Sequence, residues 1–324
     1  MHLLRNYAGK LIRAVLDKDL PPPTAMEVAH LAEAQRAFRE LHHSVEKDAS
    51  CCDEEWSDNL VQLRTRALDG DLRSFLRWDC IGRTMFVGNA LWVVKELRHL
   101  KQRKDWSARY CPGIKESRIG NPPPFIFLRR TSANLVHHAY NLARFEDLAL
   151  ASVQKMNFVV EFGGGYGSMC RLFHQMGFVG TYVIFDLPEF SILQTYYLNC
   201  LGLPVQKQRG FGNSGIHCIS NLDQLQLLVS KRGRGANSMF AATWSLSECP
   251  LPLRAKVLET VRNLDFWLFA YAEVFGGIRN VGFFKNLRMS WAEVDWHEER
   301  IKHLNGNYYL VGKRGARSQP ELQP

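Results

Sequence analysis

Long apolar runs are absent from this sequence of 324 residues. No stretch approaches the roughly 18 consecutive apolar residues that a membrane-spanning helix needs. The first residues, MHLLRNYAGKLIRAVLDKD, interrupt their apolar positions with charges every few residues and therefore lack the apolar core of a secretory signal. We expect a protein of the cytoplasm that has no membrane partner.

Cysteine pairs of the CxxC type are missing as well. Eight cysteines in 324 residues is far below the density of a disulfide-stapled domain. A zinc site needs Cys or His ligands clustered at short spacing, and the sequence offers no such cluster. We therefore expect reduced, mostly buried thiols, which stand at positions 51, 52, 80, 111, 170, 200, 218 and 249.

The charge favours basic residues in a composition that is otherwise ordinary for a globular protein, with 46% apolar and 23% charged residues. The 41 Lys and Arg exceed the 32 Asp and Glu, which gives a net charge of +9. The window 98–118 alone holds seven Lys or Arg against Asp105 and Glu116, so over half of the excess is local. We favour a solvated basic face, and a nucleic-acid groove is the alternative.

Residues 1–125 are expected to form a mostly helical region that caps the rest of the molecule. Thr24 and Glu27 have the spacing of a capping box, and apolar residues then follow at positions 28, 31, 34, 38 and 41 on one face. A second helix is predicted over 84–101, with its buried stripe at positions 87, 91, 94 and 97. The three prolines of 121–124 cannot be helical, and a third helix is predicted around 132–150.

From about residue 156 the pattern changes to short apolar segments that alternate with helical spacing. Strands are predicted over 158–162, 181–185, 239–243, 266–271 and 308–311. Helices are predicted near 169–176, over 189–201 and over 251–264. This alternation predicts an open α/β sheet with right-handed crossovers, in a domain of residues 126–312. The polar tail 313–324 is expected to be disordered.

A cluster of glycines lies between the first predicted strand and the following helix. It reads Glu-Phe-Gly-Gly-Gly-Tyr-Gly over 161–167. Glycines let a backbone turn sharply and approach a ligand, while the helix N-terminus offers unpaired N–H groups. Asp186 ends the next strand, where its carboxylate can accept hydrogen bonds from both hydroxyls of a ribose. Together these features indicate a nucleoside-bearing cofactor at the carboxyl ends of the strands.

The spacing of the glycines distinguishes two classes of cofactor. The dinucleotide pattern G-x-G-x-x-G, begun at Gly163, needs a glycine where the chain has Ser168. Begun at Gly164, it would need glycines at positions 166 and 169, which are Tyr and Met. The alternating Glu161, Gly163, Gly165 and Gly167 instead match the E/D-x-G-x-G-x-G motif of class I methyltransferases that use S-adenosyl-L-methionine (SAM). We predict SAM as the cofactor, with NAD(P) or no cofactor as the alternatives.

The predicted cofactor site contains more than the alternating glycines. A carboxylate at Glu161 suits SAM, whose methionine part carries an ammonium and a sulfonium. Tyr166 is expected to line the same end, because an aromatic face favours a sulfonium. The full set predicted to bind the cofactor is Glu161, Gly163, Gly164, Gly165, Tyr166, Gly167, Asp186, Leu187 and Trp244.

Three blocks of the sequence resemble the sugar O-methyltransferase family. They are VVEFGGGYGSMCRLF, TYVIFDLPEFSILQTYYL and FAATWSLSECP, and GNPPPF with SANLVHHAYNL resembles the stretch before them. The resemblance covers roughly residues 115–312. It implies the Rossmann-like class I methyltransferase fold, a seven-stranded mixed sheet with helices on both faces, and the use of SAM. It also implies a sugar as the acceptor.

Methyl transfer to a hydroxyl is an in-line displacement that needs alignment of the reactants, exclusion of water and a general base. His137 and His138 lie just upstream of the glycine loop, Glu248 follows the strand 239–243, and His297 is expected in a loop before the last strand. Packed or solvated histidines are the alternative reading, as is a capping acid at position 248. Trp244 can pack on the adenine, on a sugar or in the core.

The sequence therefore predicts a SAM-dependent O-methyltransferase whose acceptor is a sugar or glycoside. Paired carboxylates that would hold magnesium are absent from the predicted strand ends, so no essential metal is predicted. An RNA or protein acceptor remains the second hypothesis because of the basic charge. A SAM-binding protein without catalysis is the third, because no single residue stands out as the base.

Overall fold

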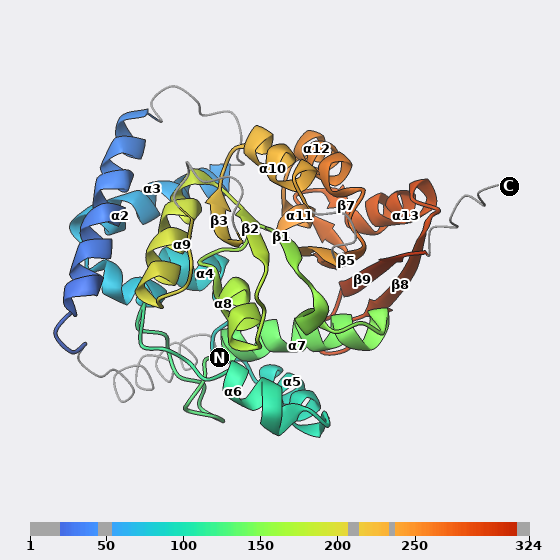
Figure 1. Cartoon of the computed structure of the whole chain (residues 1–324), viewed down its shortest axis with the longest axis horizontal. Coiled ribbons are helices and arrows are strands. Elements are labelled where there is room, and N and C mark those ends of the chain that lie inside the picture. Colours follow the sequence, from blue (N-terminus) through green and yellow to red (C-terminus); the bar gives the residue numbers. More distant parts are fainter. Residues whose placement is uncertain (1–19, 45–53, 207–213, 233–236, 316–324) are drawn as a thin grey trace, which may run out of the picture.

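A seven-stranded sheet organises the computed structural model, which describes residues 20–44, 54–206, 214–232 and 237–315 (Figure 1). The strand order is β3-β2-β1-β4-β5-β9-β8, and β9 runs antiparallel to the other six strands. The predicted Rossmann-like mixed sheet is confirmed. The strands are β1 Phe158–Phe162, β2 Thr181–Phe185, β3 Gly215–Ile219, β4 Ser238–Thr243, β5 Phe266–Ala272, β8 Val294–Arg300 and β9 Asn307–Arg314, with a separate hairpin of β6 Val274–Phe275 and β7 Ile278–Arg279.

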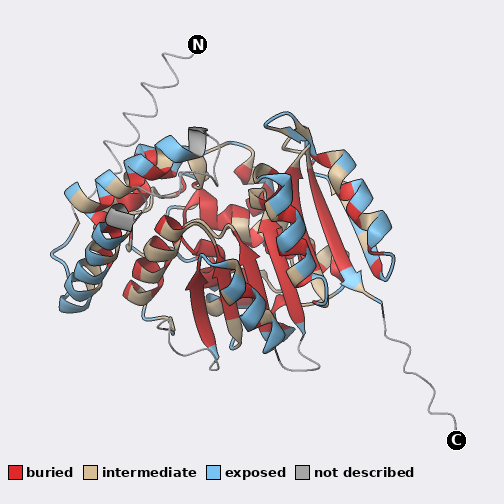
Figure 2. Cartoon of the chain, turned by 90° about the horizontal axis from the view of Figure 1, so that it is seen from above, coloured by how far each residue is buried: buried red, intermediate tan, exposed pale blue. Residues whose placement is uncertain are grey.

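Helices cover both faces of the sheet, because alternate residues of each strand face two separate apolar layers. In β1, Val159 packs in the layer that contains α7, α8 and α9, whereas Val160 packs in the layer of α10, α12 and α13. Strands β1 to β5 and β9 are almost entirely buried, and the outer helix faces are exposed (Figure 2). These helices are α7 Ala133–Ala149, α8 Ser168–Gln175, α9 Pro188–Cys200, α10 Leu222–Ser230, α11 Ser245–Glu248, α12 Leu251–Val261 and α13 Asn280–Ser290.

The described part of the N-terminal region is helical, as predicted. The capping box is present, because the N–H of Glu27 donates to Thr24 Oγ1 at 3.2 Å and the N–H of Thr24 donates to Glu27 Oε2 at 2.8 Å. The apolar face that follows is buried at Ala34 and Phe38, but Val28 is 49% exposed. The elements are α2 Ala25–Ser44, α3 Glu54–Asp69, η2 Leu72–Arg77, α4 Asp79–Thr84, α5 Val93–Gln102, the π-turn η3 Trp106–Tyr110, α6 Cys111–Gly113 and, before β1, η4 Val153–Lys155.

The helix predicted over 84–101 is wrong in its first half. The chain leaves α4 at Thr84 and becomes helical again only at Val93. The segment between them bonds to side chains instead of forming helical bonds. The N–H of Val87 donates to Asn134 Oδ1 at 2.9 Å, and the side chain of Asn89 bonds to the backbone of Pro124 and Ile126 at 3.0 and 2.9 Å.

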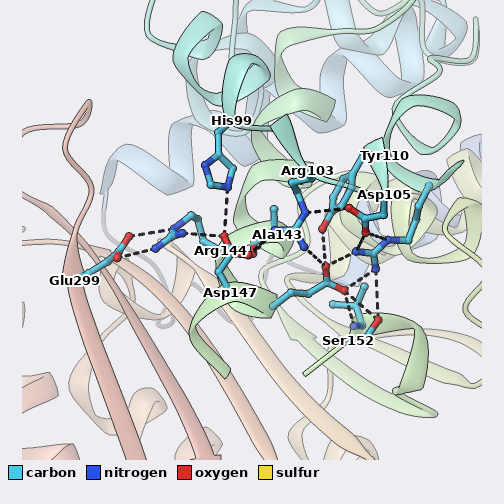
Figure 3. Close-up of polar contacts among 12 residues, drawn as sticks. His99, Arg103, Asp105, Tyr110, Ala143, Arg144, Asp147, Ser152 and Glu299 are labelled. Carbon is cyan, nitrogen blue, oxygen red and sulfur yellow. Dashed lines mark hydrogen bonds and ion pairs between the residues drawn. The ribbon is translucent and has the colours of Figure 1, made fainter. Parts of the chain in front are cut away.

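An ion network joins α5 and η3 to α7 (Figure 3). At its centre the buried Glu146 binds the guanidinium of Arg109 and accepts from the hydroxyl of Tyr110 at 2.8 Å. Arg103 reaches both Glu146, at 3.1 Å, and Asp147, at 2.5 Å. These contacts fix the position of α5 beneath α7, and α5 carries a residue of the candidate site.

The ends of the chain and the cysteines complete the comparison with the sequence. Strand β9 runs to Arg314, so the expected tail begins at least two residues later than predicted, and residues 316–324 lie outside the described residues. The cysteines within the described ranges are free thiols, while Cys51 and Cys52 lie outside them. Over the described residues, no helix is both long and apolar enough to cross a bilayer.

Candidate functional site

The glycine loop connects β1 to α8 at the carboxyl end of the sheet. Gly163, Gly165 and Gly167 have φ angles of 68°, 57° and 90°, in the left-handed region that disfavours a side chain. The alternating spacing in the sequence thus reflects alternating left-handed residues in the loop. A Cβ added at Gly163 would also collide with Cβ of Ser245, the residue that opens α11 after β4. The loop therefore lies directly against the end of β4.

Asp186 lies at the end of β2 and faces the glycine loop. Its Oδ2 accepts from the N–H of Gly165 and from the amide of Gln194, both at 3.0 Å, and its Oδ1 accepts from the N–H of Leu187 at 2.8 Å. Burial raises the pKa of Asp186 to about 7, although these hydrogen bonds favour the carboxylate. A carboxylate has about four acceptor positions, so at least one remains for a ligand hydroxyl.

Glu161 lies beneath the loop and is almost fully buried. Its Oε2 accepts from the hydroxyl of Tyr182 at 2.8 Å. Burial raises the pKa of Glu161 to about 8, and the charge of Asp186 acts in the same direction. Gly164 passes over this carboxyl so closely that an added Cβ would lie 3.0 Å from Cδ of Glu161 and 2.5 Å from Cγ2 of Ile184. Glycine at position 164 is therefore required by space, not by its φ angle.

Tyr166, which is predicted to line the methionine end of the cofactor, is buried among aromatic side chains. Its ring is 2% exposed and packs against Phe75, Phe86 and Tyr197, with ring centroids 5.1 to 6.2 Å apart. Its hydroxyl accepts from the side-chain amide of Asn134 at 3.0 Å. The ring joins the N-terminal region to the glycine loop and offers almost no surface to a ligand.

Trp244 follows β4 with a φ of 67°, an uncommon value for a residue other than glycine. Its indole N–H donates to Asn307 Oδ1 at 2.7 Å, and its ring centroid lies 5.1 Å from that of His137. Asp186 is on β2, which lies on the other side of β1 from β4. The indole and Asp186 are therefore on opposite sides of the glycine loop.

A buried polar cluster next to Trp244 is centred on Glu96 of α5. The carboxylate is 0% exposed, and its oxygens lie 2.9 and 3.1 Å from Nδ1 of His137, while Oε1 is also 2.8 Å from Nε2 of His303. Burial raises the pKa of Glu96, but the charges and hydrogen bonds of the two histidines outweigh it and hold the pKa below its ordinary value. Glu96 is therefore ionised and orients both imidazoles.

Aromatic rings frame this cluster. Trp92 meets His137 edge to face at 5.2 Å and stacks on His303 at 5.7 Å. An ionised carboxylate can only accept, so Nδ1 of His137 carries a proton toward Glu96. Its Nε2 has no hydrogen-bond partner among the described residues, and the His137 side chain is 6% exposed. This arrangement of an oriented imidazole with one open nitrogen can serve as a general base.

The other predicted bases are placed differently. Burial lowers the pKa of His138 to about 3, helped by His137, so His138 stays neutral and is a weak base. Glu248 is half-buried at the end of α11, just before α12, a position that suits a base and a capping acid alike. His297 is predicted in a loop, but it is exposed on the edge strand β8, three strands beyond β4. His297 is therefore not part of the site.

Sequence reasoning missed Glu96 and His303. Glu96 is a lone acid among basic residues, a pattern typical of a solvated helix, and His303 lies in the turn before β9 with no motif around it. Neither residue carries a local signal, because they meet only through contacts distant in the sequence. Within the described ranges, no group of three or more His, Cys, Asp or Glu side chains is arranged to hold a metal ion.

Comparisons with known proteins found no matching family model and no matching curated protein. Solved structures are similar at low identity. Magnesium protoporphyrin IX methyltransferase (ChlM) from Synechocystis PCC 6803, with bound SAM, is 11% identical with a TM-score of 0.40, over 83% of this chain and 100% of that one. The METTL16 MTase domain is 8% identical with a TM-score of 0.40, over 56% and 68%. Methanococcus jannaschii fibrillarin is 11% identical with a TM-score of 0.35, over 50% and 68%.

Proposed function

We propose that the protein is a SAM-dependent methyltransferase that methylates a hydroxyl of a small molecule, with a sugar or glycoside as the expected acceptor. One observation carries the proposal. The left-handed glycine loop bonds to Asp186 on one side, and on the other side it lies against the end of β4, where Trp244 adjoins the oriented imidazole of His137. This arrangement supports a nucleoside site on one side of the loop and a base on the other.

The residues at the loop fit SAM. The space above Gly163 and Gly164, which a Cβ would fill, lets the backbone approach a ligand. Asp186 would accept the ribose hydroxyls, and Glu161 would face the cationic methionine part, since a cation favours the ionised carboxyl. When bound, SAM supplies an electrophilic methyl group. The neighbouring N–H groups at the start of α8 would neutralise the ligand's carboxylate.

On the other side of the loop, His137 would accept the proton of the acceptor hydroxyl at Nε2. Glu96 keeps Nδ1 protonated and stabilises the imidazolium that results, which is a positioning role. The indoles of Trp92 and Trp244 exclude water and offer apolar faces to the C–H groups of a sugar.

Calorimetric titration with S-adenosylhomocysteine, with NAD as the control ligand, tests this proposal. We expect micromolar binding of the first and none of the second. Asp186→Ala should weaken binding by more than about tenfold, since it removes an acceptor of charge-assisted hydrogen bonds. Asp295→Ala is the matched control, because Asp295 is exposed on the edge strand β8. Unchanged affinity in Asp186→Ala, or binding of NAD alone, would refute the assignment.

A further inference from the structure

Exposed basic residues follow the chain from α5 to Arg130 with no exposed acid among them. The cations are Lys95, Arg98, Lys101, Lys104, Lys115, Arg118, Arg129 and Arg130. The acids of the same stretch all bond within the molecule. Glu96 binds two histidines, Asp105 binds Arg103 and Arg109, and Glu116 binds Arg171 and Ser132. The exposed charges of this stretch are thus all positive.

Three large apolar side chains stand exposed in the same stretch. Leu91 is 74% exposed, Ile126 is 41% exposed and Phe127 is 50% exposed. Their segments lie together, because Asn89, two residues before Leu91, bonds to the backbone of both Pro124 and Ile126 and so holds the chain before α5 against this turn. We call these three residues the apolar tip.

Cations flank the apolar tip on both sides. The exposed Lys95, Arg98 and Lys101 follow at spacings of three residues along one face of α5, and Leu91 lies two residues before this helix. On the other side Arg130 follows the turn, and its carbonyl accepts from the N–H of Glu116 at 2.8 Å, which brings the 115–118 segment alongside. In Figure 1 this part of the chain lies beyond α7, at the lower edge of the molecule.

We propose that the apolar tip and its flanking cations dock on an anionic phospholipid bilayer. Lys and Arg at a surface are attracted to anionic headgroups, while exposed apolar side chains enter the boundary of the acyl chains. Two of the three tip residues are aliphatic, so the tip lacks the aromatic platform on which nucleic-acid bases stack. This proposal differs from the expectation of no membrane partner, because a docking surface needs neither an apolar run long enough to span a bilayer nor a secretory signal.

Docking would bring the acceptor side of the molecule close to the lipid surface. Helix α5 carries the exposed cations on its outer face and Glu96 on its inner face, and Trp92 directly follows Leu91. The proposal itself does not depend on methyl transfer, since it rests on exposure and charge alone.

Co-sedimentation of the full chain with vesicles tests the proposal. The probes are vesicles of phosphatidylcholine alone and vesicles that also contain phosphatidylserine. We expect binding only to the second kind, and binding should weaken as salt is added. Lys95→Gln and Arg98→Gln should each lower the partition coefficient roughly fivefold, the equivalent of ~1 kcal/mol per cation. Ile126→Ser and Phe127→Ser should each lower it by about tenfold.

Matched controls come from exposed residues elsewhere. Val179→Ser removes an apolar side chain that is 92% exposed, and Lys256→Gln and Lys285→Gln remove exposed charges on α12 and α13. All three should bind like the unchanged protein. The proposal is overturned if neither vesicle binds, if both bind equally, or if control and tip variants lose binding alike. Binding to polyuridylic acid but not to vesicles would overturn it in favour of a nucleic-acid surface.

The result also separates this proposal from the proposed function. S-adenosylhomocysteine titrations of the same tip variants should match those of the unchanged protein, because the tip residues are not part of the glycine loop. If the protein binds S-adenosylhomocysteine but not vesicles, only the proposed docking surface is refuted. If it binds vesicles but not S-adenosylhomocysteine, only the proposed methyltransferase function is refuted.

Discussion

At the scale of single residues, Glu96 is the side chain whose role is clearest from its surroundings and least visible in the sequence. A fully buried carboxylate is costly unless it is paired and hydrogen-bonded, and Glu96 meets this condition through two imidazoles. One of these, His137, has its second nitrogen open. The charge at Glu96 thus makes His137 the best-oriented base among the described candidates.

Glu96→Gln should slow methyl transfer without changing cofactor binding. The amide keeps the size of the side chain but loses the charge that stabilises the imidazolium, so we expect the rate to fall by about a hundredfold, and a similar fall in His137→Gln. The measurement is transfer of labelled methyl groups from SAM to a panel of glycosides and phenols. S-adenosylhomocysteine affinity should stay unchanged in both variants.

His297→Gln is the control for this prediction, because His297 is exposed on β8. It should transfer methyl groups at the rate of the unchanged protein. If Glu96→Gln lowers only thermal stability while the transfer rate per folded molecule stays the same, Glu96 is a structural partner of the histidines and the base must be sought elsewhere.

At the scale of elements, the strand–turn–helix around the glycine loop was predictable because its signal is local. An apolar strand, a run of glycines and a helical pattern stand next to one another, and Asp186 ends the next strand. The prediction of a helix over 84–101 was wrong in its first half. The apolar spacing there is helical, but hydrogen bonds of the Asn89 and Asn134 side chains hold residues 85–92 in another conformation. Tertiary contacts there override the local pattern.

Strand β8 was missed for a related reason. Its sequence, VDWHEER, is mostly charged and has only Val294 buried, so it reads as a loop. It is nevertheless a strand, because all seven residues pair with β9 at the edge of the sheet. Edge strands tolerate such charged sequences, and charges there protect the sheet from further pairing. Strand β8 therefore lacks the apolar pattern that predicts a buried strand.

The ion network around Glu146 should be the strongest tie between α5 and α7 (Figure 3). Glu146→Gln removes the charge that faces Arg103 and the buried Arg109, which then keep only the more exposed Asp105 and Asp147 as acid partners. Breaking a buried ion pair from one side typically costs ~3–5 kcal/mol, and we expect a loss of this order in the free energy of unfolding. Urea unfolding followed by circular dichroism measures it.

Glu259→Gln provides the comparison, because Glu259 is exposed on α12. Exposed substitutions of this kind change stability by about 0.5 kcal/mol or less. Equal midpoints for Glu146→Gln and Glu259→Gln would mean that the network adds little to the connection between α5 and α7.

At the scale of the whole molecule, the candidate site is assembled from segments far apart in the chain. Glu96 comes from the N-terminal region, His137 from α7, Asp186 from β2 and His303 from the turn before β9. The proposed cofactor half could be predicted from one local motif. The proposed acceptor half could not, because its residues meet only once the N-terminal region has packed against the sheet.

The buried carboxyls of the candidate cofactor site should make the free energy of unfolding depend on pH. Burial raises the pKa of Glu161 from 4.5 to about 8 in the folded protein. The folded state holds this proton more tightly than the unfolded state, so the stabilisation is complete below the ordinary value and is lost as the pH rises through the folded value. Asp186, whose pKa is raised to about 7, acts in the same direction.

Glu161→Gln isolates this effect. The amide can still accept from Tyr182 but never ionises, so the variant should match the unchanged protein below about pH 4.5, and its gain in the free energy of unfolding should grow with pH until about pH 8. At ~1.4 kcal/mol per unit of pKa difference, the gain has an upper limit of several kcal/mol. Urea unfolding across this pH range measures it, with Glu259→Gln expected to parallel the unchanged protein. Glu161→Gln should also bind S-adenosylhomocysteine more weakly, because a substitution that stabilises the protein at a ligand site commonly weakens its function there. Parallel stability curves for Glu161→Gln and the unchanged protein would show that the carboxyl is not held neutral by its burial.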